Sequence, residues 1–202
     1  MSLAAFLLCA GRGERLRPLT ERIAKPALTF LGKSALEINK FGIEKLSPQL
    51  WLANNHHLPG QIDGLAKRLG LETLHEAEIL GTGGCLAHAA PLLRECENFL
   101  VHNADLIHTI DLEDLLERHQ ASFAMVTLAG VFRPARDTNT LSVSGDGRLL
   151  GVHGYEDFNH RDEKTRLTFA GIAFYERDFL RFVAPGREDI KRHWMRALEA
   201  GA

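Results

Sequence analysis

Near the N-terminus, glycines and positively charged residues follow one another in a spacing that suits the binding of phosphates. An apolar segment over residues 3–8 leads into Gly11 and Gly13, and Arg15, Arg17 and Lys25 come next. Glycine lets backbone N–H groups approach an anion, and the basic side chains add positive charge around it. The segment therefore predicts a site for several phosphates at once, as in a nucleoside triphosphate. An ordinary turn with solvated arginines is the alternative.

The same spacing excludes two well-known phosphate-binding loops. The dinucleotide-binding fingerprint requires a third glycine at the position of Leu16, and the P-loop requires Gly-Lys-Ser or Gly-Lys-Thr, which the sequence lacks. The pattern that remains is Gly-x-Gly-x-Arg, followed at a distance by Lys25-Pro26.

Residues 8–26 resemble the signature of the sugar-1-phosphate nucleotidyltransferases, Leu-Ala-Ala-Gly-x-Gly-x-Arg-x-x-Pro-Leu-Thr followed by Pro-Lys-Pro. Cys9 replaces one alanine of that signature and Ala24 replaces a proline, so every charged group is kept. The resemblance implies that Arg15 holds the leaving pyrophosphate and that Lys25 bridges the two reacting phosphates. It also implies nucleotide-binding positions at Leu8, Ala10, Gly11 and Gly13.

Asn103-Ala104-Asp105 follows an apolar segment and resembles the Asn-Gly-Asp element of the same family. The resemblance implies that Asp105 binds Mg²⁺, a hard cation that prefers oxygen ligands and neutralises phosphate charge. It also implies that Asn103 contacts the sugar phosphate. A turn-forming aspartate at a strand end is the alternative for Asp105, and Asp111 is expected to cap a helix rather than to bind metal.

Three other segments resemble family elements that surround the substrates. Residues 80–84, Leu-Gly-Thr-Gly-Gly, open an expected helix, and the resemblance implies that Thr82 and Gly83 read the base, with close packing as the alternative for the glycines. Residues 168–172 resemble Thr-Phe-Ser-Gly-Ile, which implies that Thr168 and Gly171 lie against the sugar.

The third segment, Asn54-Asn55-His56-His57, resembles an Asn-x-His-His-Leu element, and we assign Asn55 to the nucleotide. Adjacent side chains point in different directions, so the two histidines are interpreted as polar residues of the sheet edge and as capping partners rather than as a metal site.

The elements that must position these residues alternate between strands and helices. Strands are expected over residues 3–8, 50–53, 71–75, 99–102, 123–128 and 168–175, and helices over residues 34–46, 58–69, 83–93, 111–119 and 187–199. This order predicts an α/β fold, a three-layer, mostly parallel, Rossmann-like sheet flanked by helices. Ligands bind at the carboxyl ends of such strands, where Gly11, Asn54 and Asp105 fall.

The second half of the chain has a different character. Asp146-Gly147 predicts a turn between strands over residues 141–143 and 149–152, and thus a small inserted β-hairpin. Residues 155–166 are highly charged and are predicted to form a flexible flap.

Composition sets limits on the class of protein. With 202 residues, 45% of them hydrophobic, the chain is expected to form a single domain over residues 1–202. The net charge of −2 argues against a general nucleic-acid-binding protein. The three cysteines lack metal-binding spacing and favour a reducing, cytoplasmic location, and no apolar run is long enough to predict a membrane span. The oligomeric state stays open.

Taken with the resemblance, these features predict an Mg²⁺-dependent enzyme that joins a nucleoside triphosphate to a sugar 1-phosphate and releases pyrophosphate. The base and the sugar stay open, and a phosphocholine cytidylyltransferase is a variant within this class. Relatives continue into a strand with Trp-x-Asp-x-Gly-Thr, whose aspartate completes the metal site, whereas the sequence ends at Gly201-Ala202. We therefore expect a domain that lacks this strand. A non-catalytic nucleotide-sugar-binding module is the alternative function.

Overall fold

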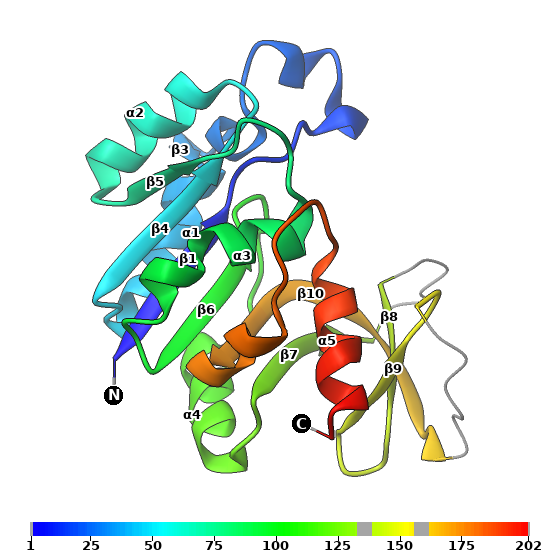
Figure 1. Cartoon of the computed structure of the whole chain (residues 1–202). Helices are drawn as coiled ribbons and strands as arrows, with labels where there is room; N and C mark the ends of the chain where they lie inside the picture. The colour runs from blue at the N-terminus through cyan, green and yellow to red at the C-terminus, as the bar shows by residue number, and fades with distance from the viewer. Residues whose placement is uncertain (1, 133–138, 156–161, 202) are drawn as a thin grey trace.

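One central β-sheet organises the chain in the computed structural model, which describes residues 2–132, 139–155 and 162–201. Its strands follow the order β5-β4-β1-β6-β10-β8-β9, and β7 pairs with the edge of β10 that faces away from β6 (Figure 1). The strands are β1 (Leu3–Leu8), β4 (Leu50–Asn55), β5 (Glu72–His75), β6 (Asn98–Asn103), β7 (Val126–Val131), β8 (Thr140–Val143), β9 (Leu149–Val152) and β10 (Thr165–Glu176). A separate two-stranded ribbon joins β2 (Thr29–Phe30) to β3 (Lys33–Ser34).

Strand direction divides the sheet into two parts. Strands β5, β4, β1 and β6 are parallel, with Leu7 of β1 opposite both Ala53 and His102. Strand β10 pairs antiparallel with β6, β7 and β8. Because β1, β4 and β6 run in one direction and in register, their carboxyl ends meet at one edge of the sheet. The predicted Rossmann-like class is thereby confirmed.

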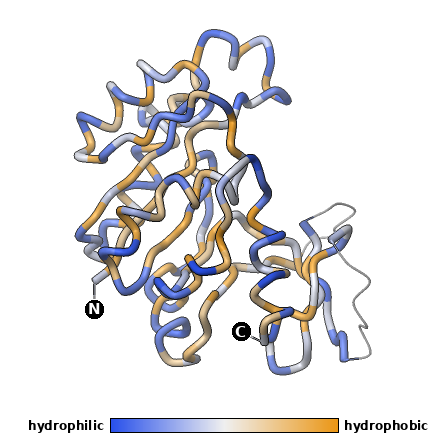
Figure 2. Tube along the Cα trace, viewed as in Figure 1, coloured by the Kyte–Doolittle hydropathy of each residue, from blue (hydrophilic) through white to orange (hydrophobic). Residues whose placement is uncertain are grey.

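Helices cover both faces of this sheet and bury two separate cores. Helices α3 (Gly81–Leu93) and α5 (Ile190–Glu199) pack on one face, whereas α1 (Ala35–Ile43), α2 (Pro59–Leu69) and α4 (Leu112–Ser122) lie on the other. Strand β1 shows the alternation, since Phe6 belongs to the first core and Leu7 to the second. Figure 2 shows hydrophobic residues along the central strands and a largely hydrophilic loop after β1.

Local sequence signals set several helix ends. Ser34 caps α1 in a capping box with Glu37, Gly70 ends α2 in the left-handed conformation, and the Asp111 carboxylate accepts hydrogen bonds from the first turn of α4. Helix α1 ends at Ile43, earlier than expected, and a 3₁₀ turn over Glu44–Leu46 follows it. Another 3₁₀ segment, Arg177–Phe182, follows β10 and leads toward α5.

The second half of the chain contains one confirmed prediction and two corrections. Strands β8 and β9 pair antiparallel as the predicted hairpin. Phe123 ends α4 with φ of 53°, so β7 begins only at Val126 instead of Phe123. The predicted flap over residues 155–166 is wrong at its end, because β10 already begins at Thr165 and pairs with Val143. Residues 156–161 of that segment lie outside the described residues.

Two global features accompany this fold. Cys9, Cys85 and Cys96 are all buried free thiols. In the part of the chain that the structure describes, no helix combines the length and apolar character required to cross a membrane.

The buried histidines His102 and His119 predict a loss of stability in acid. Burial lowers the pKa of each to about 4, whereas an unfolded histidine titrates near 6.5. Below pH 6.5 the unfolded chain thus binds more protons than the folded chain. As the pH is lowered from about 6.5 to about 4, the free energy of unfolding should fall by up to about 3 kcal/mol per histidine.

Urea unfolding at several pH values measures this loss. Glutamine does not titrate in this pH range. The free energy of unfolding of the His119→Gln variant should therefore depend less steeply on pH than that of the parent. If the free energy of unfolding changed equally steeply with pH in the two proteins, the lowered pKa of His119 would be contradicted.

Candidate active site

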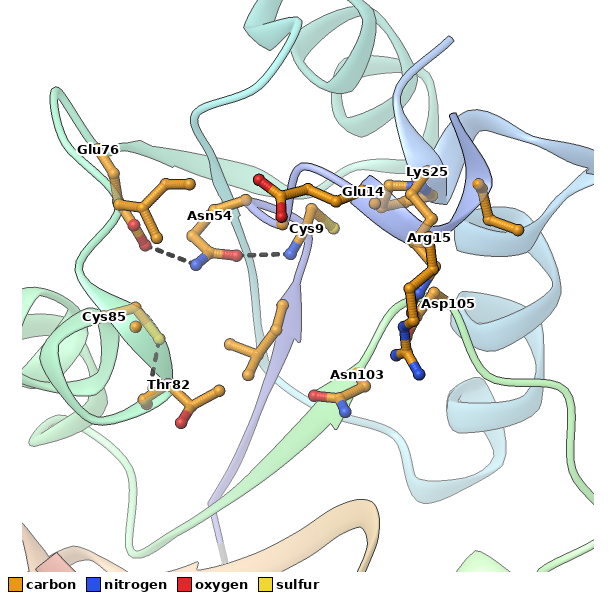
Figure 3. A pocket seen from close by; sticks show the side chains of 18 residues that line it. Cys9, Glu14, Arg15, Lys25, Asn54, Glu76, Thr82, Cys85, Asn103 and Asp105 are labelled. Atoms are coloured by element: carbon orange, nitrogen blue, oxygen red, sulfur yellow. Dashed lines mark hydrogen bonds and ion pairs between the residues drawn. The ribbon is translucent and has the colours of Figure 1, made fainter. Parts of the chain in front are cut away.

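A pocket of about 670 Å³ opens at the sheet edge where β1, β4 and β6 end. Its two ends differ in chemistry: Figure 3 shows Arg15, Lys25 and Asp105 on one side and Glu76, Thr82 and Cys85 on the other. The lining residues are Leu8, Cys9, Ala10, Gly11, Gly13, Glu14, Arg15, Leu16, Lys25, Pro26, Asn54, Glu76, Ile79, Gly81, Thr82, Cys85, Asn103 and Asp105.

The loop after β1 forms one wall of the pocket. It folds into three short 3₁₀ turns, Glu14–Leu16, Leu19–Glu21 and Lys25–Ala27. Gly13 has φ of 62°, and a Cβ atom there would lie 2.8 Å from Cγ2 of Thr20, so both backbone conformation and space require glycine. The Thr20 hydroxyl donates to the Gly13 carbonyl at 2.9 Å, and His57 Nε2 hydrogen-bonds the Thr20 carbonyl at 2.6 Å.

Charged groups from two distant chain segments meet at one end of the pocket. Lys25 Nζ forms an ion pair and hydrogen bond with Oδ2 of Asp105, which follows β6. Their side chains are 26% and 27% exposed, so both remain accessible from the pocket. Arg15 lies beside them (Figure 3) and forms no ion pair with any described residue. This end of the pocket thus presents cationic donors together with the Asp105 carboxylate.

A chain of hydrogen bonds crosses the opposite wall. The Glu76 carboxylate accepts from Nδ2 of Asn54 at 2.6 Å and from the Leu80 N–H at 2.9 Å. Oδ1 of Asn54 in turn accepts from the Cys9 N–H at 2.6 Å. Glu76 is 2% exposed and lines the pocket, and it was not among the residues predicted from the sequence. Its position directly after β5, at the same sheet edge, was the available signal.

Two thiols contribute to the lining as small apolar groups. Burial raises the pKa values of Cys9 and Cys85, and the nearby carboxylates of Asp105 and Glu76, respectively, raise them further. Both side chains therefore remain protonated thiols at neutral pH, and neither is suited to act as a nucleophile.

The structure brings together most of the predicted nucleotide-binding positions but not all of them. Leu8, Ala10, Gly11, Gly13 and Thr82 line the pocket. Asn55 does not, because successive strand residues point to opposite sides and Asn54 is the one that faces the pocket. The Asn55 amide instead bonds Asp63 and His75.

Gly83 does not line the pocket either, and its N–H donates to the Glu188 carbonyl at 2.8 Å. Close packing explains the glycines at the start of α3. A Cβ on Gly83 would lie 2.4 Å from Nε2 of His193, and one on Gly84 would lie 2.0 Å from the Gly186 carbonyl oxygen.

Of the three predicted sugar-binding positions, one lines the pocket and two do not. Asn103 lines the pocket beside Asp105, whereas Thr168 and Gly171 do not line it. Gly171 has φ of 83° at a register shift of β10, and a Cβ there would lie 2.4 Å from Nδ2 of Asn103. Gly171 therefore lies behind Asn103 and leaves room for that amide. Thr168 lies on β10, where it pairs with Thr140 and Val131.

Comparison with known proteins places this chain in a family. The sequence model of the family described as nucleotidyl transferase matches residues 4–141. The chain is 30% identical to the mannose-1-phosphate guanylyltransferase of Mycobacterium tuberculosis, over 97% of this chain and 55% of that protein. It is 35% identical to the bifunctional protein GlmU of Methanocaldococcus jannaschii, over 56% of this chain and 27% of that protein. The chain thus spans only about a quarter to a half of the length of these two relatives.

Among solved structures, HddC from Yersinia pseudotuberculosis, crystallised with GMP-PN, superposes with a TM-score of 0.71 at 18% identity, covering 93% of this chain and 83% of that one. This likeness supports the fold. The chain belongs to the nucleotidyl transferase family, as the sequence resemblance had indicated.

Gly84→Ala tests whether packing explains the glycines of α3. The added methyl group would overlap the Gly186 carbonyl oxygen, so the substitution should lower the free energy of unfolding by about 1 to 3 kcal/mol. Gly64→Ala is a matched control, because an added Cβ in α2 meets no atom within 4 Å; it should raise stability by up to about 1 kcal/mol. Thermal or urea unfolding measures both. A neutral Gly84→Ala variant would contradict the packing explanation.

Proposed function

We propose that the chain transfers a nucleotidyl group from a nucleoside triphosphate to a sugar 1-phosphate, forming a nucleotide-sugar and pyrophosphate. The observation that carries this proposal is that Arg15, Lys25 and Asp105 line one end of a pocket whose opposite wall combines apolar side chains with the polar groups of Asn54, Glu76 and Thr82. The cationic end suits phosphates, and the wall formed by Leu8, Ile79 and Thr82 suits the base. The names of the relatives agree with this reaction class.

In the proposed reaction, a phosphate oxygen of the sugar 1-phosphate attacks the α-phosphorus of the triphosphate. A new P–O bond forms, the bond from the α-phosphorus to the bridging oxygen breaks, and pyrophosphate leaves with that electron pair. Both reactants are anions, so catalysis requires positioning and charge neutralisation more than a general base. We assign Lys25 to the reacting phosphates and Arg15 to the leaving pyrophosphate.

Asp105 fits a magnesium ion that is shared with the substrate. In the described ranges 2–132, 139–155 and 162–201, no group of three or more His, Cys, Asp or Glu side chains could hold a metal by itself. Mg²⁺ is commonly bound by one or two carboxylates together with substrate phosphates and water, and Asp105 at the phosphate end meets that requirement. When bound, the ion would neutralise and orient the phosphates. Lys25, now paired with Asp105, would then be free to donate to phosphate oxygens.

We also propose that residues 1–202 act as one domain. The sheet from β1 to β10 is continuous, and α5 belongs to the same core as α3. Hydrogen bonds join residues 188–190 to Leu80, Thr82 and Gly83 at the start of α3. The last part of the chain therefore supports the pocket wall.

Lys25→Ala and Arg15→Ala should each lower the rate of pyrophosphate release by about 10² to 10³, because each removes a positioned charge from the phosphate end. The unfolding temperature of Arg15→Ala should remain close to that of the parent, because Arg15 is exposed. That of Lys25→Ala should be somewhat lower, because the substitution leaves the partly buried Asp105 carboxylate without its ion-pair partner. Arg22→Ala is the control, as it removes an exposed charge of the same loop that does not line the pocket.

The assay uses several nucleoside triphosphates with sugar 1-phosphates and phosphocholine as acceptors. A folded Lys25→Ala or Arg15→Ala variant with the parental rate would refute its assigned role. A parent that binds a triphosphate yet releases no pyrophosphate with any acceptor would favour the non-catalytic binding module.

Asp105→Asn tests the metal assignment. Calorimetric titration of the parent with a nucleoside triphosphate should give a higher affinity in Mg²⁺ than in EDTA, and the substitution should reduce that difference. Equal affinities of the parent in the two buffers would remove Asp105 from a metal site and support its alternative role as a turn former.

A further inference from the structure

The segment that carries Asp105 leaves β6 without forming regular secondary structure until α4 begins. Its first residue is firmly held, because the Ala104 N–H donates to the Leu8 carbonyl at 3.2 Å and Asn39 Nδ2 donates to the Ala104 carbonyl at 3.0 Å. Both of these bonds precede Asp105. Beyond Asp105, the side chains of Leu106 and Ile110 pack against the core beneath α1, α2 and α4.

A pair of histidines adds hydrogen bonds to this packing. His102, in β6, is fully buried, and its Nε2 lies 3.0 Å from Nε2 of His108. On its other side, His102 Nδ1 hydrogen-bonds the Asn103 carbonyl at 2.9 Å. His108 Nδ1 accepts from the Ile110 N–H at 3.1 Å. The contact between the rings closes residues 102–108 into a loop with Asp105 inside it.

The hydrogen bonds determine where the protons lie. Because the Ile110 N–H donates to Nδ1 of His108, that nitrogen carries no proton, and a neutral His108 carries its proton on Nε2. Nε2 of His102 must then accept, which leaves the His102 proton on Nδ1, where it can donate to the Asn103 carbonyl. Every bond in the series is satisfied when both rings are neutral.

The surroundings of the rings favour that neutral state. Burial lowers the pKa of His102 to about 4, with a smaller contribution from His108, and burial also lowers the pKa of His108. When both rings are neutral, each donor in the series faces an acceptor, from the Ile110 N–H through His108 and His102 to the Asn103 carbonyl. These bonds hold His108 against His102.

We propose that His102 and His108 are positioning residues that hold the segment after β6 and thereby fix the Asp105 carboxylate toward the phosphate end of the pocket. Neither histidine lines the pocket, so both act through Asp105. The proposal rests on the proposed function in one respect, the binding of a metal by Asp105. Residues that orient a metal ligand in this way typically change metal affinity by about 10- to 100-fold when they are replaced.

His108→Leu removes both hydrogen bonds, whereas His108→Gln retains one acceptor for the Ile110 N–H and one donor for His102. His119→Leu is the matched control, because His119 is a buried histidine bonded to Thr127 and Asn98 and does not line the pocket. Amide hydrogen exchange of the full chain should become faster over residues 104–110 in His108→Leu, and it should remain parental there in His119→Leu.

The second measurement is calorimetric titration at several Mg²⁺ concentrations with GTP, UTP, CTP or dTTP, whichever binds the parent most tightly. His108→Leu should raise the half-saturating Mg²⁺ concentration by roughly tenfold, with the affinity in EDTA unchanged. His108→Gln should recover most of this loss. His119→Leu should lower the unfolding temperature and leave the Mg²⁺ dependence parental.

The two measurements separate this proposal from the proposed function. Parental hydrogen exchange over residues 104–110 in His108→Leu would overturn the proposal whatever the protein binds. An unchanged half-saturating Mg²⁺ concentration in that variant, with a parent that responds to Mg²⁺, would also overturn it. A parent that does not respond to Mg²⁺ would refute the metal assignment of Asp105, and faster exchange confined to residues 104–110 in His108→Leu would still support the attachment of the segment.

Discussion

The ion pair between Lys25 and Asp105 joins the two chain segments that form the cationic end of the pocket. Lys25 belongs to the loop after β1, and Asp105 follows β6, and the parallel pairing of these strands brings both to one edge. Both charges are largely removed from solvent, and a partly buried charge is costly without a partner. Each of the two charges thus compensates the other.

Much of this arrangement follows from local sequence. Alternating strand and helix signals predict a sheet with ligands at its carboxyl edge, and Gly11, Asn54 and Asp105 do meet there. Capping residues such as Ser34 and Asp111 mark helix starts because their hydrogen bonds form within a few residues. Signals of this kind require no knowledge of the rest of the chain, which is why they were predictable.

The features that were not predicted depend on contacts between distant residues. Asn54 and Asn55 are chemically identical, and only the register of β4 against β1 decides which one faces the pocket. The N–H of Gly83 is occupied by the carbonyl of Glu188, which no local pattern reveals. Glu76 carries no motif of its own, and its place in the pocket wall depends on the pairing of β5 with β4.

The bonds from Glu76 through Asn54 to Cys9 make the identities of two of these residues interdependent. Asn54 donates to a carboxylate on one side and accepts from a backbone N–H on the other. An aspartate at position 54 alone would place two acceptors face to face, whereas a glutamine at position 76 would restore a donor between them. Related sequences can therefore exchange the amide and the carboxylate between these positions only by paired substitution, so the tolerance of one site to mutation is set by the other.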